Sequence, residues 1–195
     1  MDLQQLLGGS LGQEATQLIS QQLGIDATQA QSAVNLALPT ILNALHQNAS
    51  TDDGAAALTN AISNDHNGSS LGDLAGLAQT ALGGQGTSIL QHIFGGAEQN
   101  VTNAVSQNAG IGGGQASQVL QILAPIVLNA LGNQSQQTGG GINISSIAGI
   151  LSNFVGNHQQ QAPQNQSIIS SLLDRDKDGS VVDDVVGMLG NLFKK

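Results

Sequence analysis

Two stretches of the chain repeat one another at a distance of 86 residues. The segment 37–45, ALPTILNAL, returns at 123–131 as LAPIVLNAL. Further upstream, four residues return at the same offset: Ser20 as Ser106, Gly24 as Gly110, Ile25 as Ile111 and Ala30 as Ala116. An internal repeat of this length predicts a fold built from two similar halves. It constrains the architecture but names no chemistry.

Each copy carries the period of an amphipathic helix. Apolar side chains recur at helical spacing over 30–45 and again over 116–131. Asp26 is placed as an N-cap with Gln29 as its capping-box partner. Pro39 and Pro125 stand inside the two long helices, and we expect a kink at each. No segment shows sustained period-two alternation, so the sequence predicts an all-α, multihelical fold.

The same patterns predict shorter helices and the loops between them. Helices are expected near 13–23, 55–63, 71–82, 88–93 and 97–108, and one more is expected to be capped by Ser145 or Ser146. Polar, Gly-rich or Gln-rich stretches predict loops at 64–70, 134–141 and 157–166. The expected organisation is a first helical repeat at 1–65, connecting helices at 66–93, a second repeat at 94–156, a Gln-rich linker at 157–166 and a helix-loop-helix at 167–195.

Charge excludes several classes of function. The net charge is -9, and all four basic residues lie in the last 21 positions: Arg175, Lys177, Lys194 and Lys195. Binding to nucleic acid, to an anionic membrane or to phosphate in a P-loop needs clustered or placed cations, so none of these is expected. No signal peptide or membrane-length apolar run is present, which predicts a cytoplasmic protein. Export without a signal peptide remains an alternative.

An acidic loop near the C-terminus has the spacing of a calcium site. Asp174, Asp176 and Asp178 precede Gly179 in the pattern D-x-D-x-D-G, as in an EF-hand loop. Calcium takes six to eight oxygen ligands, which alternate carboxylates on a tight turn supply. Ser180 would add its backbone carbonyl. The sequence therefore predicts Ca²⁺ as the cofactor of this loop.

The loop departs from the EF-hand pattern at its last ligand. Val185 stands where a bidentate Glu belongs, so either Asp183 or Asp184 must close the site, or binding is weak. The alternative is a helix N-terminus capped by Asp178, with both later carboxylates favoured by the helix dipole. In the calcium case a structural role is favoured over a sensor role, because a single loop has no partner hand.

Few other residues point to chemistry. The chain has no Cys, and its four His are scattered without metal-ligand spacing. His66 with Asp65 and Asp73 is the best candidate for a hydrolytic site. The apolar face over 181–193 either packs on the protein's own core or docks on another subunit.

Three motifs carry a family resemblance. LLGG at 6–9, the repeated ALPTILNAL segment and the ending LLDRDKDGSVVDDVVGMLGNLF are similar to the YidB-like bacterial family, a domain of unknown function. The resemblance covers most of the chain. It implies an all-helical fold with duplicated halves and an acidic tail, and it supplies no established activity, substrate or catalytic residue.

Three hypotheses about function follow from the sequence. The first is a non-enzymatic structural or interaction protein that self-associates as a homo-oligomer and binds calcium at the acidic loop. The alternative is a small-ligand or lipid carrier that uses an apolar groove between the helical halves. The third is a hydrolase acting through His66.

Overall fold

The protein is helical throughout the part that the computed structural model describes, residues 7–66, 68–137 and 142–161. No strand occurs in these ranges, so the predicted all-α fold is confirmed. The elements are α2 (Ser10–Leu23), α3 (Ala27–Ala49), α4 (Asp52–Asp65), η1 (Ser69–Gly72), α5 (Leu74–Thr80), η2 (Ala81–Gln85), α6 (Gly86–Phe94), η3 (Gly95–Ala97), α7 (Glu98–Ala109), α8 (Gly113–Gln137) and α9 (Ile144–Gln161).

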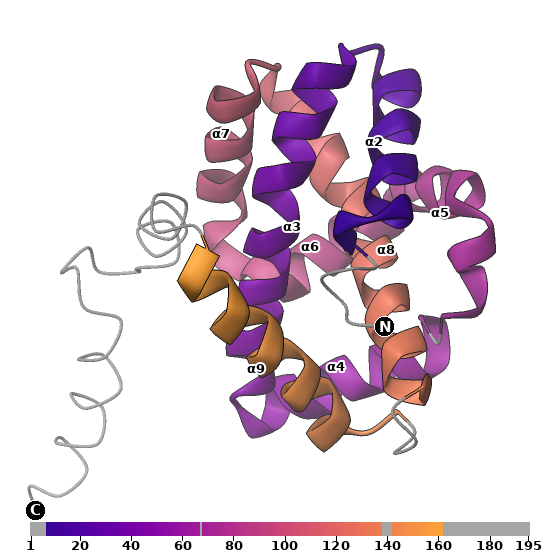
Figure 1. Ribbon diagram of the computed structural model, residues 1–195, viewed down its shortest axis with the longest axis vertical. Helices are drawn as coiled ribbons and strands as arrows, with labels where there is room; N and C mark the ends of the chain where they lie inside the picture. Colours follow the sequence, from indigo (N-terminus) through magenta and orange to yellow (C-terminus); the bar gives the residue numbers. More distant parts are fainter. Residues whose placement is uncertain (1–6, 67, 138–141, 162–195) are drawn as a thin grey trace, which may run out of the picture.

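The two long helices α3 and α8 form the centre of the core. They pack against each other, and between them they also contact α2, α4, α5, α6, α7 and α9. In Figure 1, α2 and α7 flank α3 at one end of the molecule, and α4 lies at the other end. With no Trp or Tyr available, the seam is filled by small and aliphatic side chains that are fully buried: Ala30, Ala33, Ala37, Ile41, Ala116, Leu120, Leu123 and Val127. Small residues at such contacts allow the backbones to approach closely.

The turns that join α2 to α3 and α7 to α8 share one geometry. Gly24 (φ 62°, ψ 35°) and Gly110 (φ 65°, ψ 36°) each end a helix in the left-handed conformation that glycine adopts without a Cβ clash. Ser20 Oγ donates to the carbonyl of the isoleucine that follows the turn at 2.7 Å, and Ser106 Oγ does the same at 2.6 Å. The repeated residues therefore make repeated hydrogen bonds.

Two glutamines tie these turns to one another. Gln29 Nε2 donates to the carbonyl of Gly110 at 2.8 Å, and Gln115 Nε2 donates to the carbonyl of Leu23 at 3.3 Å. Each glutamine also accepts, through Oε1, the backbone N–H three residues before it. In α3 this is the capping box predicted from Asp26 and Gln29, and the structure confirms it.

Several helices run further than the sequence predicted. Helix α4 continues to Asp65, α8 to Gln137 and α9 to Gln161, each into a segment expected to be a loop or linker. Polar composition was the basis for those loops, yet Gln is a good helix former and keeps its side chain in water on an exposed face. The cap of α9 is also different: Asn143 Oδ1 accepts the Ser146 N–H at 2.9 Å, so neither Ser145 nor Ser146 is the cap.

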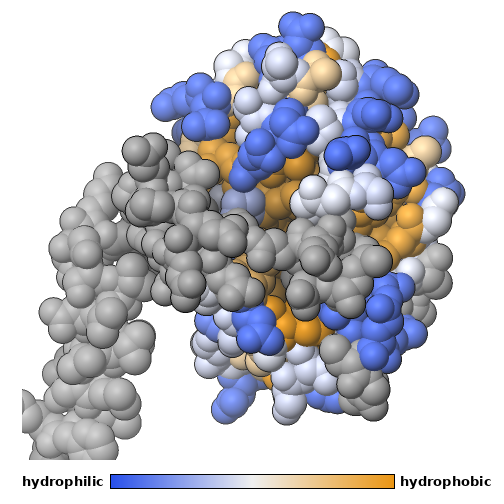
Figure 2. Space-filling model, in the orientation of Figure 1, coloured by the Kyte–Doolittle hydropathy of each residue, from blue (hydrophilic) through white to orange (hydrophobic). Residues whose placement is uncertain are grey.

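The surface of the described helices carries neutral polar groups rather than ion pairs, because no Lys or Arg occurs before position 175. On the face seen in Figure 2, polar side chains surround smaller exposed apolar areas. No single helix in the described ranges is long and apolar enough to cross a membrane. The segments Leu74–Ala109 and Gly113–Gln137, bent by 109°, meet that criterion only as a pair.

Candidate functional site

A cavity of about 370 Å³ opens between α4 and α6. Its floor is apolar and comes from α3, α4, α6 and α8, through Leu45, Leu58, Ile93 and Leu128, which are at most 7% exposed. Its rim is polar and mostly exposed: Asn48, Asp65, Gln85, Ser88 and His92. An apolar floor with a few polar groups is the usual composition of a small-molecule site.

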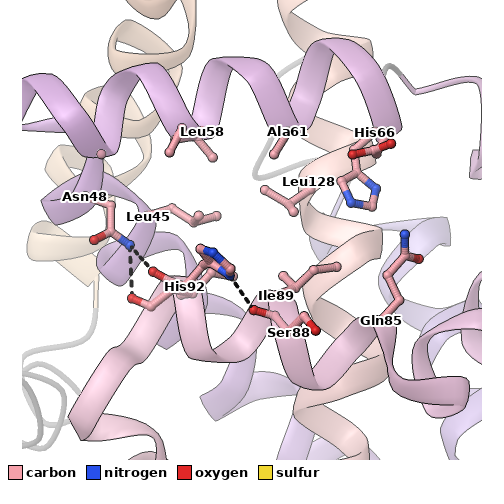
Figure 3. Close-up of a pocket in the computed structure, with 14 residues that line it drawn as sticks. Leu45, Asn48, Leu58, Ala61, His66, Gln85, Ser88, Ile89, His92 and Leu128 are labelled. Atoms are coloured by element: carbon pink, nitrogen blue, oxygen red, sulfur yellow. Dashed lines mark hydrogen bonds between the residues drawn. The ribbon is translucent and has the colours of Figure 1, made fainter.

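The cavity exists because α4 and α6 share neighbours without packing on each other. Both helices contact α3 and α8, but they make few contacts with one another. The sides of α4 and α6 that face the gap carry small residues, including Gly54, Ala57, Ala61 and Ser88. Side chains of this size leave the space between the helices unfilled (Figure 3).

His66 lies at the end of α4 and is only 4% exposed. Asn129 Nδ2 lies 3.1 Å from its Nδ1, and the same Nδ2 donates to the carbonyl of Pro125 at 2.9 Å. The Asn129 carbonyl oxygen accepts the backbone N–H of Gly68 at 3.2 Å. One buried asparagine on α8 thus holds both the His66 ring and the backbone that follows it.

The other end of the cavity is held by two side chains that bind backbone carbonyls. Asn48 Nδ2 donates to the carbonyls of His92 and Ile93, at 3.4 Å and 3.0 Å, and thereby ties α3 to the end of α6. His92 Nδ1 donates to the carbonyl of Ser88 at 2.7 Å. A carbonyl can only accept, so Nδ1 of His92 carries a proton. Figure 3 shows these bonds at the end of the cavity away from His66.

Burial lowers the pKa of His66 below its ordinary value of 6.5, and the nearby Asp65 carboxylate raises it by a smaller amount. The donation from Asn129 acts in the same direction as burial, because a proton on Nδ1 would face a second donor. His66 is therefore held as a neutral imidazole at neutral pH.

The structure brings together only part of the hydrolytic site predicted from sequence. Asp65 and His66 both line the cavity. Asp73 instead caps α5, where its Oδ1 accepts the Gly76 N–H at 2.8 Å, and it does not line the cavity. A short polar cap explains the position of Asp73 without any chemistry.

The predicted calcium ligands lie outside the described residues. These are Asp174, Asp176, Asp178, Ser180, Asp183 and Asp184. Over 7–66, 68–137 and 142–161, no three His, Asp or Glu side chains are grouped so that they could hold a metal ion.

A second cavity, of about 310 Å³, lies between α2, α3 and α9. The polar side chains on its α3 wall, Gln31 and Asn35, are exposed and hydrogen-bond each other at 2.9 Å. It offers no buried polar group comparable to His66, so the cavity between α4 and α6 is the better candidate.

Comparison with known proteins places the chain in a family. Residues 5–134 match the model of a bacterial family of unknown function, DUF937. The chain belongs to the DUF937 family. The YidB-like resemblance agrees with this assignment, since YidB is a DUF937 member. No curated protein and no solved structure is significantly similar to the chain.

All residues that line the cavity fall within the part of the chain that matches DUF937. Sequence reasoning singled out Asp65 and His66 but missed Asn129. The signal was present: Asn129 is the polar residue inside the apolar run PIVLNAL, where a buried polar side chain needs partners. The rim residues on α6 do not interrupt an apolar run in this way, so the sequence does not mark them as part of a site.

Proposed function

We propose that this DUF937 protein is a non-enzymatic binding protein that holds a small, mainly apolar molecule in the cavity between α4 and α6. The observation that carries the proposal is the apolar cavity of about 370 Å³ with a buried imidazole at one end. Pockets of this size and composition suit small organic ligands. The cavity takes residues from α3 and α4 in the first half and from α8 in the second, in keeping with a carrier that uses space between the halves.

The bonding of His66 supports binding over hydrolysis. A general base in a hydrolase has its Nδ1–H oriented by an acceptor, which leaves a lone pair on Nε2 and stabilises the imidazolium. Here the partner of Nδ1 is the donor Asn129 Nδ2, which opposes both the required tautomer and proton uptake. Asp73, the second carboxylate of the hydrolase hypothesis, is engaged as a helix cap.

Filling the cavity should strongly weaken ligand binding. Ala57 lines the cavity from α4, so Ala57→Phe places a ring in that space. The neutral probe N-phenyl-1-naphthylamine, which fluoresces in apolar surroundings, can be titrated without background because the chain has no Trp or Tyr. We expect saturable binding to the wild type and a loss of at least about tenfold in affinity in Ala57→Phe, from steric exclusion.

The matched control is Ala56→Phe, since Ala56 is the adjacent exposed alanine of α4 and does not line the cavity. Circular dichroism should show both variants folded. Equal binding by the two variants, or none by the wild type, would remove the support for this function.

A second candidate function rests on the acidic loop. The D-x-D-x-D-G spacing at 174–179 favours calcium binding by Asp174, Asp176 and Asp178, with either Asp183 or Asp184 closing the site. In this proposal the ion stabilises a helix-loop-helix over 167–195, whose apolar face then mediates self-association.

Calcium removal should change the mass in solution if that proposal holds. Light scattering after size exclusion is compared in excess Ca²⁺ and in chelator, with Asp176→Ala alongside. We expect an oligomer in calcium that is lost both in chelator and in the variant. The chelator removes the ion, and the substitution removes one of the carboxylates that would bind it. A monomer in every condition contradicts calcium-dependent assembly.

The repeated geometry also supports a proposal about origin. We infer that α2–α3 and α7–α8 are copies of one helix pair. The support is the matching offsets in sequence, the paired glycine conformations, the paired serine bonds and the reciprocal glutamine bonds. In this proposal the cavity has no duplicate, because its walls α4 and α6 lie between the two copied helix pairs and are not part of either.

A further inference from the structure

We infer that the cavity between α4 and α6 selects an uncharged ligand whose polar end is a hydrogen-bond acceptor, held by the Nε2–H group of His66. The inference rests on the proposed function, because it names the ligand class of the same cavity. It follows from which atoms of Asn129 and His66 can donate and which can accept.

Backbone groups fix the orientation of the Asn129 amide. Its Oδ1 faces the N–H of Gly68, which can only donate, and its Nδ2 faces the carbonyl of Pro125, which can only accept. A flipped amide would oppose donor to donor and acceptor to acceptor. Asn129 is fully buried, so water cannot compensate for such a mismatch. Nδ2 must therefore be the atom that faces His66.

The amide orientation then fixes the tautomer of His66. Nδ1 accepts from Asn129 Nδ2 at 3.1 Å and carries no proton. In a neutral imidazole the proton is then on Nε2, which becomes a donor. None of the described residues accepts a hydrogen bond from this atom, and it is open to the cavity that His66 lines, since the buried side-chain nitrogen without a partner in the described ranges is Nδ1 of His46. In Figure 3 the ring lies at one end of the cavity, beside Leu128 and above Gln85.

An N–H donor that is accessible only at the end of an apolar cavity can form one directional hydrogen bond, and a ligand acceptor placed there satisfies it. A carbonyl, ether or hydroxyl oxygen at the end of an apolar body would place its acceptor at Nε2–H and its hydrocarbon against Leu58 and Leu128. His92, at the opposite end of the cavity, is exposed to solvent, so water can satisfy its ring and it makes no comparable demand on a ligand.

Charge argues against an ionic ligand. A carboxylate would need a cation, and the described residues contain no Lys or Arg. His66 does not supply the charge, because protonation would oppose Nδ1–H to the Asn129 donor. Asp65 at the rim repels anions further. A cationic group, in turn, would face the positive end of the Nε2–H dipole. An uncharged acceptor fits all of these conditions.

The test compares three naphthalene probes of similar shape: 2-acetylnaphthalene, 2-ethylnaphthalene and 2-naphthoate. Each is titrated into the full chain while methyl resonances of Leu and Ile are followed by NMR, since Leu45, Leu58, Ile93 and Leu128 form the floor. We expect the ketone to bind about five- to tenfold more tightly than the hydrocarbon, as one satisfied neutral hydrogen bond gives. The carboxylate should bind most weakly.

Two substitutions at His66 test the roles of its two ring nitrogens separately. His66→Asn places an acceptor near the position of Nδ1, which can still take the Asn129 donation, and leaves nothing at Nε2. His66→Gln places an amide donor near Nε2 and has no group at Nδ1. The preference for the ketone over the hydrocarbon should fall to about onefold in His66→Asn and return in part in His66→Gln, while hydrocarbon affinity stays within about twofold.

The outcomes distinguish this inference from the proposed function. If neither neutral probe shifts the floor methyls, the cavity does not bind ligands and the proposed function fails. If the two neutral probes bind equally to the wild type, or if the preference for the ketone persists unchanged in His66→Asn, the cavity binds ligands but His66 does not select them. Tightest binding by the carboxylate would likewise overturn the inference.

Discussion

Replacing Asn129 with Leu should lower the free energy of unfolding by about 3 kcal/mol. Leucine has a similar size, but it leaves the Gly68 N–H and His66 Nδ1 without their partner, and the Pro125 carbonyl loses its side-chain donor while keeping the helical N–H of residue 129. Each buried group left unsatisfied costs about 1–3 kcal/mol, and the added apolar burial offsets part of the total. For a chain of this size the melting temperature should fall by roughly 6–12 °C.

The repeat supplies the control for this measurement. Asn43 occupies the matching position of the similar segment 37–45, but it is only half-buried and its side chain makes no hydrogen bond to a described residue. Asn43→Leu should therefore change the free energy of unfolding by less than about 0.5 kcal/mol. Urea titrations followed by circular dichroism compare the two variants. If both variants lost the same unfolding free energy, the hydrogen bonds of the Asn129 side chain would not be the cause of the loss.

Asn43 and Asn129 also show which parts of the structure could be predicted from the sequence. Both asparagines stand in near-identical segments, ILNAL and VLNAL, and helical periodicity correctly predicted the helix around each. Only the fold separates them, because the chain after α4 returns to α8 and brings His66 and Gly68 beside Asn129. Contacts 61 and 63 residues apart leave no trace in local periodicity.

The candidate site was predictable in part for a similar reason. Asp65 and His66 are recognisable as candidates from sequence because titratable groups are rare in this chain, whereas the cavity depends on a gap between two helices. Such a gap results from small residues on α4 and α6 whose helices share neighbours without touching, and small residues are common all along this sequence. The predicted loop boundaries are wrong at the ends of α8 and α9, because a Gln-rich composition is typical of linkers but Gln also sustains a helix.

The second large effect is expected at Gly86, the first residue of α6. A Cβ added there would lie 2.8 Å from both the carbonyl oxygen and the Cβ of Gln121 on α8. That carbonyl lacks its helical donor, because the residue four positions later is Pro125 and proline has no N–H. Pro125 leaves the carbonyl of Gln121 without a helical N–H donor, and Gly86, which has no side chain, lets α6 approach that carbonyl.

Gly86→Ala should therefore cost about 2 kcal/mol of unfolding free energy, even though Gly86 has helical dihedrals (φ -58°, ψ -40°) and alanine is the better helix former. The contacts are with the Cβ and carbonyl oxygen of Gln121 and the carbonyl oxygen of Ala81, none of which can rotate away, so the start of α6 must move off α8. Because α6 forms one wall of the cavity and Gln85 lines it at this end, affinity for N-phenyl-1-naphthylamine should change as well.

Gly83→Ala is the matched substitution in the same segment. No atom lies within 4 Å of a Cβ at Gly83, and its φ is not in the left-handed range, so alanine should be neutral or stabilising by up to about 1 kcal/mol. Chemical denaturation of both variants measures the difference. If Gly86→Ala were as stable as Gly83→Ala, α6 would have room to move on α8, and the close approach to Gln121 would not fix the position of α6.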